Sequence, residues 1–134
     1  MSYAVEQKAI LSHLAANWTT TPVAYPNAAY KPVTGAAWLE ARVIRQDAFN
    51  VDLVPNRRVR HPGLVSLTLH VPANQGDGAA LEMADTLAAV FRNRNVSGCL
   101  FRAPTVRPVG TDGAWYRVQV DAPYWRDSVL PLTG

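Results

Sequence analysis

The chain has 134 residues, of which 49% are hydrophobic and 17% are charged, and its formal net charge is +3. These values predict one globular domain over residues 1–134, large enough to bury a core, and they exclude an intrinsically disordered chain. No apolar run reaches the about 20 residues that a membrane-spanning helix needs. Residues 1–14 lack the pattern of a secretory signal peptide, so we expect none.

The cysteine and the basic residues narrow the range of possible functions further. Cys99 is the one cysteine of the sequence, which excludes an intramolecular disulfide and fits a reducing compartment. The sequence has 13 basic residues, and all of them except Lys8 and Lys31 are arginines. A net charge of +3 is too small to indicate a nucleic-acid-binding protein by itself. The excess of arginine over lysine indicates contacts with other surfaces, because arginine is favoured in interfaces and against phosphate.

The first element is a predicted helix over residues 2–17. Ser2 can cap it, and Ile10, Leu14 and Trp18 recur at helical spacing to form one apolar stripe. Pro22 and the threonines before it end the helix. Residues 23–25 form a short extended segment that leads into a loop.

Two long strands are predicted next. Residues 37–47 alternate between apolar and polar side chains, and residues 51–54 extend this strand after a bend. Residues 55–58 form a turn, and residues 59–71 return as the second strand with Val65, Leu67 and Leu69 facing inward. Together they predict a long hairpin with a polar, arginine-bearing tip.

The second half predicts one helix and two more strands. Residues 78–93 form the helix, with Asp77 as its N-cap. Residues 99–107 and 115–123 form strands, and we expect a turn over residues 109–113 between them. We expect residues 125–134 to be a loose C-terminal tail. The predicted fold class is α+β, with two helices packed on a mainly antiparallel or mixed sheet in the order α-β-β-β-α-β-β.

The sequence offers little that resembles a catalytic or metal site. His13, His61 and His70 are not at metal-ligand spacings from one another or from Cys99, which we interpret as a buried structural thiol. Residues 74–78 precede a helix, but they lack the lysine of a phosphate-binding loop and the third glycine of a dinucleotide-binding loop. We therefore expect no catalytic residue, no cofactor and no metal, and we expect that the protein is not an enzyme.

The basic residues are most concentrated at Arg57, Arg58 and Arg60, on the predicted hairpin tip. They can meet DNA or an acidic partner surface. The alternative, to which we give about twice the weight, is an exposed turn that charge keeps soluble, because short basic runs on turns are common.

Several other residues are candidates for a subunit interface. Trp38, Trp115 and Trp125 lie near the ends of predicted elements, where tryptophan serves either the core or an interface. Arg42 points outward from its predicted strand. Glu82 and Asp85 share one face of the second helix, where they can pair with a neighbour's arginine or simply be solvated.

The whole pattern resembles the phage tail-terminator-like family, relatives of the minor tail protein U of lambda-like long-tailed phages. The resemblance spans residues 3–126 and lies in the order of the elements and in short local sequence segments. Its segments are PVAYPN at 22–27, TGAAWLEARV at 34–43, RHPGLVSL at 60–67, VPANQGDG at 71–78, WYRVQV at 115–120 and PYWR at 123–126.

This resemblance implies a structural virion protein. A member of the family would form a homohexameric ring that caps the tail tube, ends tube polymerisation and provides the head-docking surface at the neck. It would contact its own copies, the tail tube protein and a head–tail connector or head completion protein. DNA would pass through the lumen without sequence-specific binding. The family offers no catalytic residue to transfer.

The resemblance also implies a location and leaves alternatives open. The protein would be found at the head-proximal end of the tail, and in the host cytoplasm during assembly. Arg57, Arg58 and Arg60 would then face the lumen or the tail tube. The alternatives are a small nucleic-acid-binding module, another head–tail connector or completion protein and, as a minor possibility, a small hydrolase.

Overall fold

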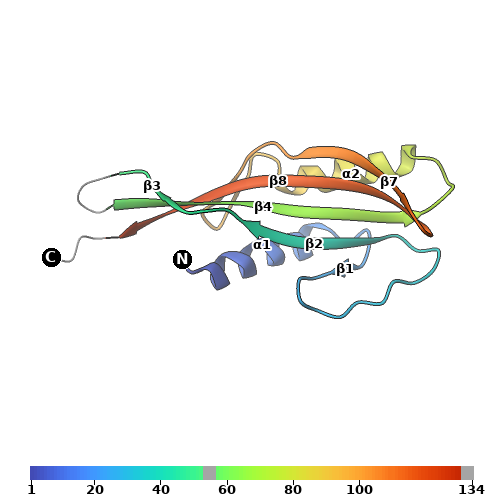
Figure 1. Ribbon diagram of the computed structural model, residues 1–134, viewed down its shortest axis with the longest axis horizontal. Coiled ribbons are helices and arrows are strands. Elements are labelled where there is room, and N and C mark those ends of the chain that lie inside the picture. Colours follow the sequence, from blue (N-terminus) through green and yellow to red (C-terminus); the bar gives the residue numbers. More distant parts are fainter. Residues whose placement is uncertain (53–56, 131–134) are drawn as a thin grey trace.

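The computed structural model describes residues 1–52 and 57–130, which form an α+β fold (Figure 1). Two helices accompany a curled, mixed sheet, so the predicted fold class is confirmed. In chain order the elements are α1 (Tyr3–Asn17), β1 (Val23–Ala24), β2 (Trp38–Arg45), β3 (Phe49–Asn50), β4 (Arg57–Pro72), α2 (Gly78–Phe91), β5 (Asn95–Val96), β6 (Cys99–Phe101), β7 (Thr105–Asp112) and β8 (Trp115–Leu130).

The two longest strands, β4 and β8, run along the whole length of the molecule (Figure 1). Each has 16 residues, and they pair antiparallel from Arg57 opposite Leu130 to Pro72 opposite Trp115. The sheet order is β1-β2-β4-β8-β6-β5, with β3 beside β4 and β7 beside β8. Only β1 and β2 pair in parallel among the described strands. All other strands are therefore organised around one antiparallel ribbon.

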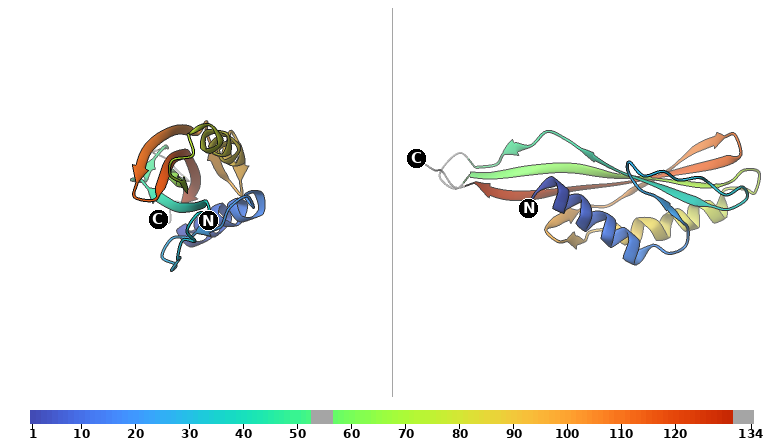
Figure 2. Two further views of the ribbon diagram at one scale, coloured as in Figure 1. Left: turned by 90° about the vertical axis from the view of Figure 1, so that its right-hand side faces the viewer. Right: turned by 90° about the horizontal axis from the view of Figure 1, so that it is seen from below.

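Both helices lie on the same side of this sheet (Figure 2). Residues that alternate along β2, β4 and β8 point toward the helices and are buried, and α1 and α2 together supply the opposite half of the core. The largest fully buried apolar side chains are those of Ile10, Leu14, Leu39, Val65, Leu67, Leu69, Leu87, Phe91, Val118 and Val120. Burial of this apolar surface is the main force that holds the helices on the sheet.

The start of α1 follows the sequence expectation. The Ser2 hydroxyl accepts a hydrogen bond from the Val5 backbone N–H at 3.1 Å, as an N-cap should. Asp77 is the N-cap residue of α2, as predicted, but its side chain makes no cap hydrogen bond. Among the described residues, neither helix has the length and apolar character needed to cross a membrane.

The C-terminal segment is a strand and not the predicted tail. The sequence predicts a loose tail over residues 125–134, but β8 continues to Leu130 and pairs with β4 throughout. The inward-facing alternation of β8 goes on through Tyr124 and Arg126. A proline at position 123 and a charged residue at an inward position hid this continuation. Residues 131–134 lie outside the described residues.

Strand boundaries in the second half also differ from the prediction. Residues 99–107 are not one strand, because residues 102–104 have no regular secondary structure and separate β6 from β7. The expected turn over residues 109–113 is mostly strand, since β7 runs to Asp112. Gly113, with φ of +60°, begins the two-residue turn into β8. The observed order, α-β-β-β-β-α-β-β-β-β, therefore contains more strands than predicted.

The predicted hairpin tip is only partly described. Residues 53–56 lie outside the described residues, while Arg57, Arg58 and Arg60 are strand residues of β4 and not turn residues. Strand β2 pairs with β4 from Trp38 opposite His70 to Arg45 opposite Gly63. Farther along, β3 pairs with Val59 and Arg60.

Candidate assembly surface

Neither α1 nor α2 covers the second face of the sheet (Figure 2). Because side chains alternate along a strand, the residues between the buried ones on β2, β4 and β8 point away from α1 and α2. We call this surface the open face. It carries Trp38, Glu40, Arg42, Ser66, Thr68, His70, Trp115, Arg117, Gln119, Asp121 and Trp125.

An aromatic cluster occupies one end of the open face. The Trp38 ring stacks on the His70 ring with centroids 3.9 Å apart and an interplanar angle of 5°. Trp115 meets Trp38 edge to face at 6.2 Å, and Tyr30 packs on Trp38 at 5.3 Å. The buried Nε1 of Trp38 and both ring nitrogens of His70 have no hydrogen-bond partner among the described residues. Burial lowers the pKa of His70, so the ring is uncharged near neutral pH.

A chain of polar side chains crosses the middle of this face. The Thr68 hydroxyl donates a hydrogen bond to the side-chain Oε1 of Gln119 at 2.7 Å, and the side-chain Nε2 of Gln119 donates to the Asp121 carboxylate at 2.9 Å. Asp121 also accepts from Arg107 of β7 at 3.3 Å. These contacts connect β4, β8 and β7 across the sheet. A polar sheet face that no helix covers suits water or another protein better than a core.

The predicted arginine tip is neutralised in part by neighbouring carboxylates. Arg60 donates two hydrogen bonds to Asp127, at 2.9 and 3.0 Å. Arg58 lies 3.5 Å from Asp52 and 3.9 Å from Asp127. The hydrogen bond with Arg60 lowers the pKa of Asp127 below its usual value. Arg57 begins β4 opposite Leu130. Arg58 and Arg60 thus meet acidic partners within the chain, which sequence spacing did not reveal.

The structure distributes the six interface candidates between two surfaces. Trp38, Arg42, Trp115 and Trp125 lie on the open face. Glu82 and Asp85 are exposed on α2, which packs on the other side of the sheet. The three tryptophans do not form one cluster. Trp38 and Trp115 are in contact, while Trp125 lies ten residues farther along β8.

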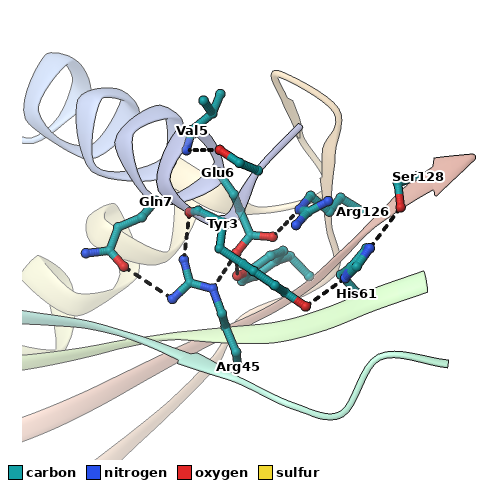
Figure 3. A network of polar contacts seen from close by, with 10 residues as sticks. Tyr3, Val5, Glu6, Gln7, Arg45, His61, Arg126 and Ser128 are labelled. Carbon is teal, nitrogen blue, oxygen red and sulfur yellow. Dashed lines mark hydrogen bonds and ion pairs between the residues drawn. The ribbon is translucent and has the colours of Figure 1, made fainter. Parts of the chain in front are cut away.

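A buried polar cluster, which the sequence analysis missed, connects α1 to the strands (Figure 3). Glu6 is 1% exposed and forms an ion pair with Arg126, which is 3% exposed. The Glu6 carboxylate also accepts hydrogen bonds from Arg45 and from the Tyr124 hydroxyl, both at 2.9 Å. Burial and the hydrogen bond to Glu6 raise the pKa of Tyr124. Every partner of this carboxylate comes from the fold itself, so the cluster fixes α1 on the sheet.

The signal for this cluster was present in the sequence. Glu6 lies four residues before Ile10 and eight before Leu14, on the same helical stripe. Arg126 continues the inward alternation of Val120 and Tyr124. Two opposite charges at core-facing positions of different elements predict a buried pair.

The three histidines lie apart and have separate surroundings. His13 contacts the Val90 carbonyl at 2.8 Å, and His61 lies 2.9 Å from both the Tyr3 hydroxyl and the Ser128 hydroxyl. His70 belongs to the aromatic cluster. Within residues 1–52 and 57–130, no three histidine, cysteine or acidic side chains lie close enough together to hold a metal ion. Cys99 is buried, as expected, and burial raises the pKa of its thiol to about 11.

Comparison with known proteins adds a family and a fold. The sequence model of the phage tail terminator protein family matches residues 6–124. No curated protein matches the chain. One solved structure aligns with a TM-score of 0.70 over 98% of this chain and 99% of the other, at 22% sequence identity. That likeness supports the fold alone. The family match covers most of the sequence, and the chain therefore belongs to the phage tail terminator protein family and has a structural role in a phage tail.

Proposed function

We propose that this tail protein forms a homohexameric ring that caps the tail tube, stops its polymerisation and provides the head-docking surface at the neck. The match of the family to residues 6–124 is the observation that carries this proposal. The role is structural and not enzymatic, and it needs no cofactor. The partners are copies of this chain, the tail tube protein and a head–tail connector or head completion protein.

The distribution of aromatic and charged side chains supports a protein that assembles. Trp38, Trp115 and Trp125 are partly exposed on the open face, and Arg42 is exposed there. Tryptophan and arginine contribute most to protein–protein interfaces, especially near their centres. We propose that these four residues, together with Glu82 and Asp85, lie in contacts with other subunits. A ring requires two different patches on each copy, and the open face and α2 provide two.

We further propose that Arg57, Arg58 and Arg60 face the lumen or the tail tube. The pairing of Arg58 and Arg60 with Asp127 and Asp52 favours a mildly polar lining over a strong DNA-binding surface. DNA would then pass without sequence-specific contacts. Reversal of all three charges should impair tail assembly or DNA delivery. Intact assembly and delivery in that variant would refute this placement.

The central experiment is polymerisation of purified tail tube protein in the presence and absence of this chain. Electron microscopy should find shorter tubes that carry a sixfold ring at one end. Tubes of unchanged length with bare ends would contradict the proposal. The nucleic-acid-binding alternative instead predicts binding to free DNA that weakens steeply as salt increases. Titration of labelled DNA at two salt concentrations separates the two functions.

A further inference from the structure

Three arginines that are separated in the sequence come together where α2 ends. The backbone N–H of Asn93 donates to the Arg102 carbonyl at 3.3 Å, and that of Phe101 donates to the Arg94 carbonyl at 2.8 Å. These bonds bring Arg94 and Arg102 beside Arg92, the C-cap of α2. We call Arg92, Arg94 and Arg102 the arginine corner. All three are exposed, and none belongs to an ion pair among the described residues.

An aromatic ring holds one of these arginines in place. The Arg102 guanidinium lies over the Trp125 ring, 4.4 Å from its centroid, and Arg60 lies 5.2 Å from the same ring. Stacking on tryptophan restricts the arginine side chain while it leaves N–H donors available. The arginine corner is thus a partly ordered cationic surface that adjoins the open face.

The other half of α2 has the opposite charge. Glu82 and Asp85 are exposed on the helix, and Asp77 is exposed at its N-cap. None of the three carboxylates belongs to an ion pair among residues 1–52 and 57–130. Asp85 and Arg92 are seven residues apart, which corresponds to about 10 Å along a helix. That separation is too long for a direct ion pair, so the carboxylates and the arginine corner remain separate patches.

We propose that copies of this chain contact each other head to tail, with Glu82 and Asp85 of one copy against the arginine corner of the next. The occupant is a second copy because the exposed carboxylates of Glu82 and Asp85 are opposite in charge to the arginine corner, and neither patch has an ion-pair partner among the described residues. The two patches differ, so the contact is heterologous and can continue around a ring. This inference rests on the proposed function, and it specifies which surfaces of the subunit meet.

A charge exchange tests the contact directly. One variant combines Arg94→Glu with Arg102→Glu, and the other combines Glu82→Lys with Asp85→Lys. In each variant alone, like charges meet, and we expect at least about tenfold weaker self-association by sedimentation and loss of tube capping. In an equimolar mixture the copies alternate, every contact regains opposite charges, and assembly should return.

Matched controls and a second readout keep the test decisive. Lys8→Glu and Asp47→Lys change exposed charges elsewhere and should assemble as the unchanged chain does. Thermal unfolding verifies that every variant is folded. If the unchanged chain caps tubes and the two variants also do so, the contact is refuted while the proposed function stands. Failure of the mixture to restore assembly, or a mixed complex that stops at two copies, also refutes it. If the unchanged chain neither self-associates nor caps tubes, the proposed function itself is wrong.

Discussion

The Tyr124 ring lies directly over the backbone of Gly63, its partner in the β4–β8 ribbon. A β-carbon at position 63 would lie 2.5 Å from two atoms of the Tyr124 side chain, the hydroxyl oxygen and the ring carbon that bears it. The missing side chain of Gly63 therefore makes room for the ring. This placement brings the Tyr124 hydroxyl to Glu6, so the glycine helps to position the buried cluster under α1.

We predict that Gly63→Ala destabilises the protein by about 1–3 kcal/mol, because the Tyr124 ring must move and gives up its hydrogen bond to Glu6. Urea unfolding monitored by circular dichroism measures this change. Gly78→Ala is the matched control, since a β-carbon there meets nothing within 4 Å. It should leave the free energy of unfolding unchanged or slightly higher. Equal effects of the two substitutions would contradict the prediction.

The buried ion pair between Glu6 and Arg126 predicts an asymmetric response. Glu6→Gln leaves Arg126 as a buried cation without a counter-charge, and we expect a loss of about 3–5 kcal/mol. Arg126→Met should cost less, because Glu6 keeps its bonds from Arg45 and Tyr124. Combining the two substitutions should recover part of the loss of Glu6→Gln.

The free energies of unfolding of the three variants test this order. Arg107→Gln is a suitable control, because that side chain is 65% exposed and its ion pair with Asp121 lies at the surface. We expect it to cost less than about 1 kcal/mol. The explanation fails if Glu6→Gln is no more destabilising than this control.

The core could be predicted from the sequence wherever one local rule sufficed. The apolar stripe of α1 and the alternation of Val65, Leu67 and Leu69 each follow from the period of one element. The end of β8 could not be predicted in this way. Its pairing with β4 depends on a partner more than 50 residues earlier in the chain, and Pro123 and Arg126 interrupt the expected alternation.

The candidate surfaces could be predicted as residue types but not as arrangements. The sequence indicated Arg58 and Arg60 as a basic cluster, yet Asp127 partly neutralises them only because the strands pair across 67 residues. The same limit applies to the arginine corner, which forms because backbone hydrogen bonds join Arg94 to Phe101 and Arg102 to Asn93. The spacing of charges along a sequence does not predict which residues they pair with, because these partners are distant in the sequence.

His70 predicts a pH dependence of stability. Burial lowers its pKa below the usual 6.5, and nearby Arg117 acts in the same direction, while Glu40 and Asp112 oppose it. Below pH 6.5 the unfolded chain therefore binds a proton more readily than the folded one, and stability falls as pH decreases through the folded pKa. Well above pH 6.5 the His70 ring is neutral in both the folded and the unfolded chain, so this group no longer makes stability depend on pH.

Urea midpoints of the unchanged chain and of His70→Gln, measured between pH 5 and 8, test this sign. The difference between the two proteins isolates His70 from other titrating groups. It should favour the variant progressively as the pH falls below 6.5. Nuclear magnetic resonance titration gives an independent value, and a His70 pKa at or above 6.5 would overturn the argument.

Cys99 should be protected from thiol reagents in the folded protein. Burial, reinforced by the charge of Glu6, raises the pKa of this thiol to about 11, so at pH 8 about one molecule in a thousand carries the reactive thiolate. We expect an aromatic disulfide reagent to modify the native chain at least about a hundredfold more slowly than the urea-unfolded chain. Cys99→Ala provides the blank, because the sequence contains no other cysteine. Modification at the same rate with and without urea would mean that the β6 region opens readily, and that the core between α2 and β8 is not closed over this side chain.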